Sequence, residues 1–370
     1  SKDFHCLKNI KKVSITHTPL QRQLLTIDFF KVFAAQVIIL HHLSRYGILS
    51  EMITYPLSQI ANWFDLYGAN AVPIFLVIAG YLSSKSFQSH ERLNSFGAMI
   101  TNRYLRLAPS FLIVLIFTIG AAKIARMFSV EEYIGNPETW TQFLAHLFLV
   151  HQIFDVESIF AGAWYVAIDW QLYVFLTLLL TVLDRFVFRV TALFVCTIFS
   201  LTYFNQHSQF DVYFFYFLVP YGLGILAFWA SQEPNHRHRH LALTFFTLAN
   251  IAILITTLFN PNIKNALSIC VALVLLLWGN RQYQNLYLRI TQVIVWLSQR
   301  SYGAFLIHFS LILLGNALFN QVLEQTPLNA LIVILVICFL SWACAHLLYI
   351  WVELPSRRLQ IFSTQPLQQN

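Results

Sequence analysis

The sequence predicts an all-α protein, a polytopic membrane bundle of about ten transmembrane helices. Of its 370 residues, 58% are hydrophobic and only 11% are charged, and 34 are Phe. A soluble protein would carry roughly a quarter charged residues. The apolar residues also gather into runs long enough to cross a bilayer as helices. The net charge of +7 is better explained by membrane topology than by nucleic acid, so no nucleic-acid partner is expected and the partner is the lipid bilayer.

Separate apolar runs define the predicted spans along the chain. They cover 24–43, 63–84, 105–126, 162–183, 187–204, 211–230, 241–259, 264–280, 301–319 and 328–351. The preceding Ser1 to Arg22 is polar and basic and lacks the short apolar core of a cleavable signal peptide. We therefore expect the first span to act as its own insertion signal.

Charge orients these spans, because an even number places both termini on one side. With both termini in the cytoplasm, most Lys and Arg residues fall in cytoplasmic segments. The exceptions are Lys31, which lies within a span, and the external Arg45, Lys123, Arg126 and Lys264. Five acidic residues share one external loop, namely Glu131, Glu132, Glu138, Asp155 and Glu157. This bias follows the positive-inside rule and predicts an N-in, C-in topology.

Three regions follow from this topology. Residues 1–23 form a basic cytoplasmic segment, 24–358 the transmembrane domain and 359–370 a cytoplasmic tail. The long external loop 127–161 contains an apolar run that either lies in the membrane interface or folds back over the bundle. Residues 286–300 mix apolar and basic residues and predict an interfacial amphipathic helix.

Lys31 and His42 are costly residues inside the first apolar span. Eleven residues correspond to nearly complete helical turns, so both side chains share one face, about 16 Å apart along the axis. Asp28 falls on roughly the same stripe. Ionisable groups within a membrane are usually functional. The simpler alternative is that His41 and His42 merely cap the helix at the interface.

Asp169 lies in an apolar helix that begins near Gly162. Under the predicted topology Asp169 and His42 both lie in the external half, where a carboxylate would orient an imidazole that acts as a general base. Alternatively, Asp169 pairs structurally with a Tyr, Trp or Arg of another helix. Arg103 and Arg106 share a face at a cytoplasmic helix end, where they suit a phosphate clamp, although basic residues are common there in any case.

His308 lies about two turns inside the ninth span, where it could contact a ligand or be a satisfied core residue. The five cysteines, of which four lie in apolar spans, show no metal-ligand spacing and are interpreted as packing residues. No metal site is predicted, and no cysteine is well placed as a nucleophile.

These segments, in this order, resemble the acyltransferase-3 family of integral membrane acyltransferases. Lys31 and His42 match its basic residue, ten intervening residues and catalytic histidine. The other matching segments are Ile27 to Lys31, Pro73 to Leu82, Arg103 with Arg106, Trp164 to Tyr173 and Ser301 to His308. The chain departs from the family pattern with Lys31 in place of Arg, Ala79 in place of Ser and Asp169 in place of Glu.

The resemblance implies transfer of an acyl group, most often acetyl, from cytoplasmic acyl-CoA to a hydroxyl of an extracytoplasmic glycan, in the bacterial cytoplasmic membrane. The glycan could be capsule, O-antigen, exopolysaccharide or periplasmic glucan. Carried over to this chain, the resemblance implies catalytic roles for His42, Asp169 and Lys31, and acyl-CoA binding by Arg103, Arg106 and Lys31. Lesser candidates for substrate or pore contacts are Asp28, Trp164, Tyr173, Tyr302 and His308. The alternative function is a transporter of a glycan or lipid precursor, although no repeat typical of such transporters is visible.

Overall fold

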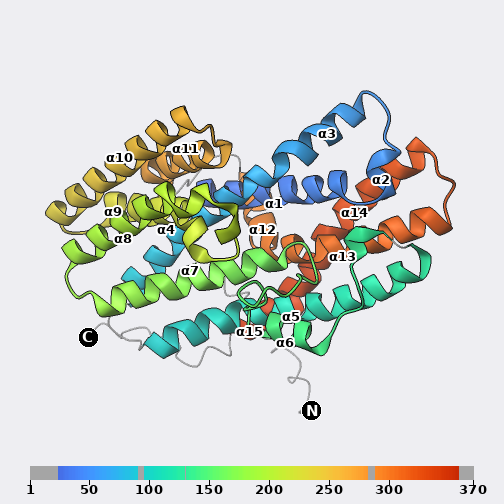
Figure 1. Cartoon of the computed structure of the whole chain (residues 1–370), viewed down its shortest axis with the longest axis horizontal. Coiled ribbons are helices and arrows are strands. Elements are labelled where there is room, and N and C mark those ends of the chain that lie inside the picture. The colour runs from blue at the N-terminus through green and yellow to red at the C-terminus, as the bar shows by residue number, and fades with distance from the viewer. Residues whose placement is uncertain (1–23, 91–95, 130, 282–287, 358–370) are drawn as a thin grey trace, which may run out of the picture.

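The structure, a computed structural model, describes residues 24–90, 96–129, 131–281 and 288–357. This part of the chain is helical and contains no β-strand (Figure 1). Nine of its helical segments are long and apolar enough to cross a membrane. The fold is therefore the predicted all-α membrane bundle. The predicted N-terminal segment 1–23 and tail 359–370 lie outside the described residues.

Every predicted span is a helix in the structure. The long segments are α1 (Leu25–Arg45), α4 (Val72–His90), α5 (Phe96–Phe128), α7 (Ala163–Val182), α8 (Phe186–Thr202), α9 (Leu218–Gln232), α10 (His236–Phe259), α13 (Ser301–Gln321) and α14 (Pro327–Leu348). The shorter α11 (Ile263–Trp278) matches the eighth predicted span. Helix α4 continues α3 (Leu57–Tyr67) through the 3₁₀ turn η1 (Gly68–Ala71).

The remaining helices are short and connect the spans. They are α2 (Ile48–Glu51), α6 (Trp140–Leu147), α12 (Leu288–Ser298) and α15 (Leu354–Ser356), with a π-helical turn η6 (Tyr349–Glu353) after α14. The 3₁₀ turns are η2 (Glu132–Ile134), η3 (Phe204–Gln206), η4 (Ser208–Phe210) and η5 (Phe214–Phe217). Helix α12 confirms the helix predicted over 286–300.

Polar side chains define where several helices begin. The Thr139 side chain accepts from the backbone N–H of Gln142, and the Gln142 side chain accepts from the Thr139 N–H, which forms a capping box at α6. Asn235 and Asn262 accept from the first free N–H groups of α10 and α11. These bonds satisfy donors that have no partner inside the helix.

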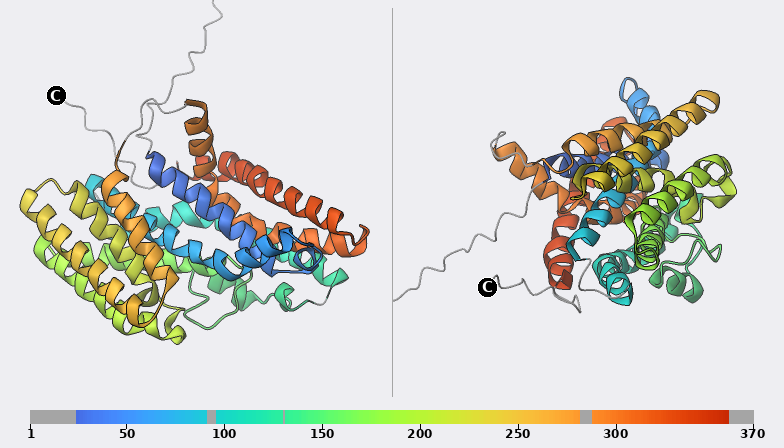
Figure 2. Two further views of the ribbon diagram at one scale, coloured as in Figure 1. Left: turned by 90° about the horizontal axis from the view of Figure 1, so that it is seen from above. Right: turned by 90° about the vertical axis from the view of Figure 1, so that its left-hand side faces the viewer.

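The bundle has two groups of helices joined by central ones. Helices α8 to α11 pack together at one end, whereas α13 packs against α14 and α5 at the other (Figures 1 and 2). Helix α1 contacts α13 and α4, and α7 contacts α5 and α4. Helices α4 and α9 cross very closely, because a Cβ on Gly80 would collide with the Tyr221 carbonyl oxygen and one on Gly224 with that of Val77.

The loop between α5 and α7 folds back into the bundle. Its outer part is held at the end of α5, where Arg126 Nη2 donates to Glu138 Oε2 at 2.7 Å. Deeper down, Tyr104 Oη donates to the Leu147 carbonyl at 2.6 Å, and the Phe160 ring packs on Phe111. Since α5 rises about 25 Å from Phe111 to its end, Phe160 lies far inside. Irregular backbone at membrane depth occurs only where it is buried in protein or lines an aqueous cavity.

Candidate active site

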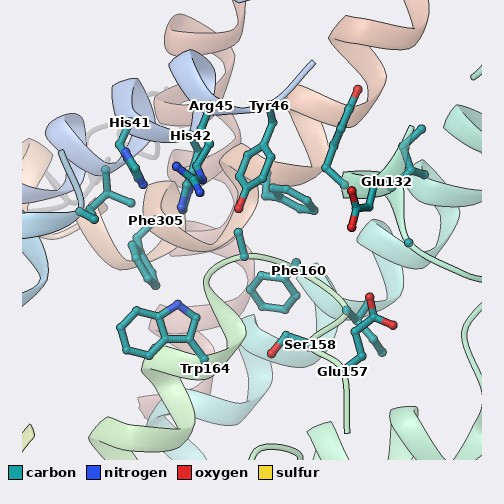
Figure 3. Close-up of a pocket in the computed structure, with 18 of the residues that line it drawn as sticks. His41, His42, Arg45, Tyr46, Glu132, Glu157, Ser158, Phe160, Trp164 and Phe305 are labelled. Carbon is teal, nitrogen blue, oxygen red and sulfur yellow. The ribbon is translucent and has the colours of Figure 1, made fainter. Parts of the chain in front are cut away.

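The inward loop closes one side of a cavity of about 450 Å³. The opposite wall is the end of α1, and α7 and α13 contribute further residues (Figure 3). The lining residues that matter for chemistry are His41, His42, Arg45, Tyr46, Glu132, Tyr133, Glu157, Phe160, Trp164 and Phe305. Cavities of this size typically bind small molecules. Trp164, a predicted substrate contact, does lie on this wall.

His42 faces the cavity and is hydrogen-bonded to His308 of α13. Its Nδ1 lies 2.7 Å from His308 Nε2, and both rings are buried. His308 Nδ1 in turn lies 3.3 Å from the Ala304 carbonyl oxygen, which can only accept. The network therefore assigns the proton of His308 to Nδ1 and the shared proton to His42 Nδ1. The remaining nitrogen, His42 Nε2, keeps its lone pair and is free to accept a proton.

The neighbouring His41 has a structural contact. Its Nδ1 donates to the Phe64 carbonyl of α3 at 2.9 Å, and this bond fixes α3 against α1. His41 therefore does more than cap the helix end, and of the two histidines His42 is the one that is hydrogen-bonded to another imidazole. The preference for His42 over its neighbour as the catalytic histidine stays a prediction.

Lys31 and His42 lie on one face of α1, as the spacing predicts, because the helix is continuous from Leu25 to Arg45. The residues between them on that face, Ala35 and Ile38, are buried. The imidazole pair also lies deep. Helix α1 ends just after His42, whereas α13 rises about 20 Å further from His308 to its end.

The sequence suggested that the Asp169 carboxylate orients the His42 imidazole. The structure corrects this, because Asp169 has a different partner. Asp169 Oδ2 accepts from Arg103 Nη2 at 2.5 Å, and both side chains are largely buried. The physical reason is the inward loop, because it makes α7 start deep in the bundle, next to Phe305. If α7 started at the membrane surface, Asp169 would lie closer to the cavity. The alternative, a structural pair with an arginine, is what the structure contains.

This ion pair also changes the predicted arginine clamp. The Arg103 guanidinium is held by Asp169 and lies 5.1 Å from the centre of the Tyr173 ring. Arg106 has no ion pair among the residues described, and its side chain is exposed. Arg106 is therefore the free arginine of the two, whereas Arg103 and Tyr173 belong to the Asp169 contact.

A basic cluster gathers around Lys31, on the side of the bundle away from the cavity. Arg103, Arg106 and Arg357 repel the Lys31 ammonium, and Asp28 attracts it. Asp28 also accepts from Ser298 Oγ of α12 at 2.6 Å. Glu353 is the carboxylate that attracts Arg106 and Arg300. Cations outnumber carboxylates in this cluster, so it can hold an anionic ligand.

Aromatic side chains separate the basic cluster from the cavity. The rings of Phe75, Tyr165 and Phe305 contact one another with centroids 5.3 to 5.8 Å apart. Tyr302, another predicted pore residue, donates from Oη to the Leu107 carbonyl at 3.0 Å and so joins α13 to α5. His42 thus lies between a basic compartment and an open cavity.

Two buried histidines hold the inward loop. The rings of His146 and His151 stack with centroids 3.9 Å apart. His146 Nδ1 donates to the Gln142 carbonyl and its Nε2 accepts from the Ile159 N–H, next to the cavity wall. Burial lowers the pKa of His146 to about 4 and that of His151 to about 3, and the neighbouring His146 lowers the latter further. Both rings are neutral at pH 7.

Sequence reasoning missed most of the cavity wall. Glu132, Tyr133 and Glu157 come from a loop without periodicity, and nothing in the pattern marks them as neighbours of His42. His308 was a candidate, but its partner was not identified. One signal could have suggested the pair of His42 and His308: the two histidines lie at the same depth on different predicted spans.

The fold and the site together define a multi-pass membrane protein with a buried imidazole pair between a basic cluster and a cavity. The chain belongs to the acyltransferase-3 family, because that family's acyltransferase domain matches residues 24–346. It is therefore a membrane acyltransferase, as the motifs predict. The Regulator of hypoxia-inducible factor 1 from Caenorhabditis elegans is 20% identical over 417 aligned positions, which cover 95% of this chain and 83% of that protein. No solved structure matches the chain.

Proposed function

We propose that this acyltransferase moves an acyl group from cytoplasmic acyl-CoA to a hydroxyl of a glycan on the opposite side of the membrane. One observation carries the proposal: the free nitrogen of His42 faces a cavity near one end of α1, while a cluster of cations surrounds Lys31 towards the other end of the same helix. The anionic CoA suits the basic side, and a polyhydroxyl acceptor suits the cavity with its Tyr and Trp walls.

In the transfer step, His42 Nε2 takes the proton of the acceptor hydroxyl as its oxygen attacks the thioester carbonyl. The carbon–sulfur bond then breaks, and the proton on His42 passes to the departing thiolate. The products are an ester and free CoA, with no net change in protons. Throughout, His42 Nδ1–H donates to His308, which holds the ring in the required tautomer and orientation.

Lys31 and Arg106 are the proposed contacts of the CoA phosphates, since neither forms an ion pair within the described chain. Arg103 supports this side indirectly, by fixing Asp169 and Tyr173. The acyl-pantetheine arm would then pass the Phe75, Tyr165 and Phe305 rings to reach His42. Acetyl is the group that the family resemblance favours, and no bound metal is needed for any step.

The proposed location is the bacterial cytoplasmic membrane, with the basic cluster on the cytoplasmic side. The charge bias along the sequence supports that orientation. A transporter of a glycan or lipid precursor is the competing function. It would need no acyl-CoA, which makes the two functions separable by experiment.

The test uses purified protein in lipid nanodiscs with acetyl-CoA and a cell-envelope glycan. We expect release of free CoA together with a gain of acetyl on the glycan. His42→Ala should abolish both, whereas His41→Gln should keep most of the activity. Full turnover by His42→Ala would overturn the assignment of the base. Glycan movement across proteoliposomes without any CoA release would favour the transporter.

A further inference from the structure

The mouth of the cavity above His42 is lined by two carboxylates, Glu132 and Glu157. In Figure 3 they lie at one end of the lining, with the imidazoles and Trp164 at the other. Both side chains are exposed, and neither has an ion-pair partner among the described residues. They therefore act on whatever enters as full negative charges.

The cation nearest to this entrance is already neutralised. Arg45, which also lines the cavity, donates from Nη1 to Asp65 Oδ1 at 3.2 Å. Arg126, on the same side, is bound to Glu138. Meanwhile Glu131 of the inward loop adds exposed negative charge beside Tyr133. The entrance therefore has a negative field, the opposite of the basic cluster around Lys31.

The rest of the wall suits a sugar. Tyr46, Tyr133 and Trp164 offer aromatic faces and polar groups, and His42 Nε2 is the free hydrogen-bonding group at the inner end. The cavity volume of about 450 Å³ is within the range of small-ligand sites. Aromatic faces and carboxylates together recognise hydroxyl and amino groups and repel anions.

We propose that the cavity selects an acceptor whose sugar unit carries no negative charge, a neutral or amino-bearing sugar, and rejects uronic, phosphorylated and sulfated units. Glu132 and Glu157 are the residues that determine this specificity, and His42 receives the proton of the hydroxyl. The inference rests on the function proposed above and names its acceptor class. Opposite charge at the two entrances also keeps the anionic donor out of the acceptor cavity.

Three p-nitrophenyl glycosides that differ only in charge test the inference: glucoside, glucosaminide and glucuronide. Both retention by the protein in nanodiscs and acetyl transfer are measured. We expect the glucuronide to be retained and acetylated at least about tenfold less well than the other two glycosides, as one to two like-charge contacts imply. The double variant Glu132→Gln with Glu157→Gln should raise the retention and acetylation of the glucuronide relative to those of the glucoside. Asp155→Asn, which removes the same kind of charge from the loop outside the cavity wall, should change the ratio little.

Equal use of the glucuronide by the unaltered protein would overturn the inference, and so would failure to retain any of the three glycosides. An unchanged ratio in the double variant would remove Glu132 and Glu157 as its cause. These outcomes differ from failure of the proposed function itself, which would appear as CoA release that is independent of His42.

Discussion

His42 and His308 form a buried imidazole pair, with Nδ1 of the first 2.7 Å from Nε2 of the second. A carboxylate in the place of His308 would add a charge that is expensive to bury. A neutral ring avoids that cost and still accepts the Nδ1 proton, so His42 keeps one tautomer. The pair therefore orients His42, the proposed base, without placing a permanent charge in the bundle.

Replacing His308 should impair turnover more than binding. In His308→Leu the Nδ1–H of His42 has no acceptor, so we expect kcat to fall by roughly 100-fold, within the range of general-base effects, while KM for acyl-CoA changes little. His308→Gln, whose amide oxygen can accept, should recover part of the loss. Steady-state CoA release measures both constants. If both variants lost the same thermal stability and His308→Gln recovered no kcat, His308 would instead have a packing role.

The Arg103–Asp169 pair should affect stability rather than chemistry. Removing one partner leaves an uncompensated buried charge, so Asp169→Asn should destabilise the protein by about 3 to 5 kcal/mol. The double variant Arg103→Gln with Asp169→Asn should be less destabilised than the sum of the two single variants. Unfolding in detergent measures each. If Asp169→Asn kept full stability but lost turnover, a direct role at the reacting atoms would be indicated.

The sequence allowed prediction of what depends on one helix, and failed where two helices must be placed against each other. Lys31 and His42 share a face because α1 is regular, and long apolar runs locate the spans. The partner of Asp169 depends on how deep α7 begins. That depth is set by the inward loop, where Phe160 packs on Phe111 and no periodicity is available. The same loop supplies Glu132 and Glu157, so this wall of the cavity could not be predicted.

The close crossing of α4 and α9 gives a packing prediction. Gly224→Ala should destabilise the protein strongly, because its Cβ would collide with the Val77 carbonyl oxygen of a packed backbone, and overpacking costs about 1 to 3 kcal/mol or more. The matched control is Gly120→Ala in α5, where a Cβ meets no atom within 4 Å. Melting temperature and yield of folded protein measure both. Equal behaviour of the two variants would contradict a close helix crossing.

The stacked pair of His146 and His151 predicts a loss of stability in acid. Their folded pKa values, about 4 and about 3, lie below the ordinary value of 6.5. Between the folded pKa values and pH 6.5, the unfolded chain therefore binds more protons than the folded protein does. Stability from these rings is fully present above about pH 6.5 and falls as the pH drops towards the folded pKa values. Each ring contributes a loss of about 2 kcal/mol between pH 7 and pH 5.

His151→Phe isolates this effect, because both ring nitrogens of His151 lack a hydrogen-bond partner in the described structure and Phe can keep the stack. We expect the variant to match the unaltered protein at pH 7 and to be more stable at pH 5, by about 2 kcal/mol. His240→Phe, at an exposed site on α10, is the control and should leave the pH dependence unchanged. Thermal unfolding from pH 5 to pH 8 provides the comparison. Parallel curves for His151→Phe and the unaltered protein would show that His151 has the same pKa in the folded and unfolded states, as a ring that does not stay buried would have. His146 then becomes the remaining source of acid sensitivity, since protonating its Nε2 breaks the bond from the Ile159 N–H and releases the cavity wall.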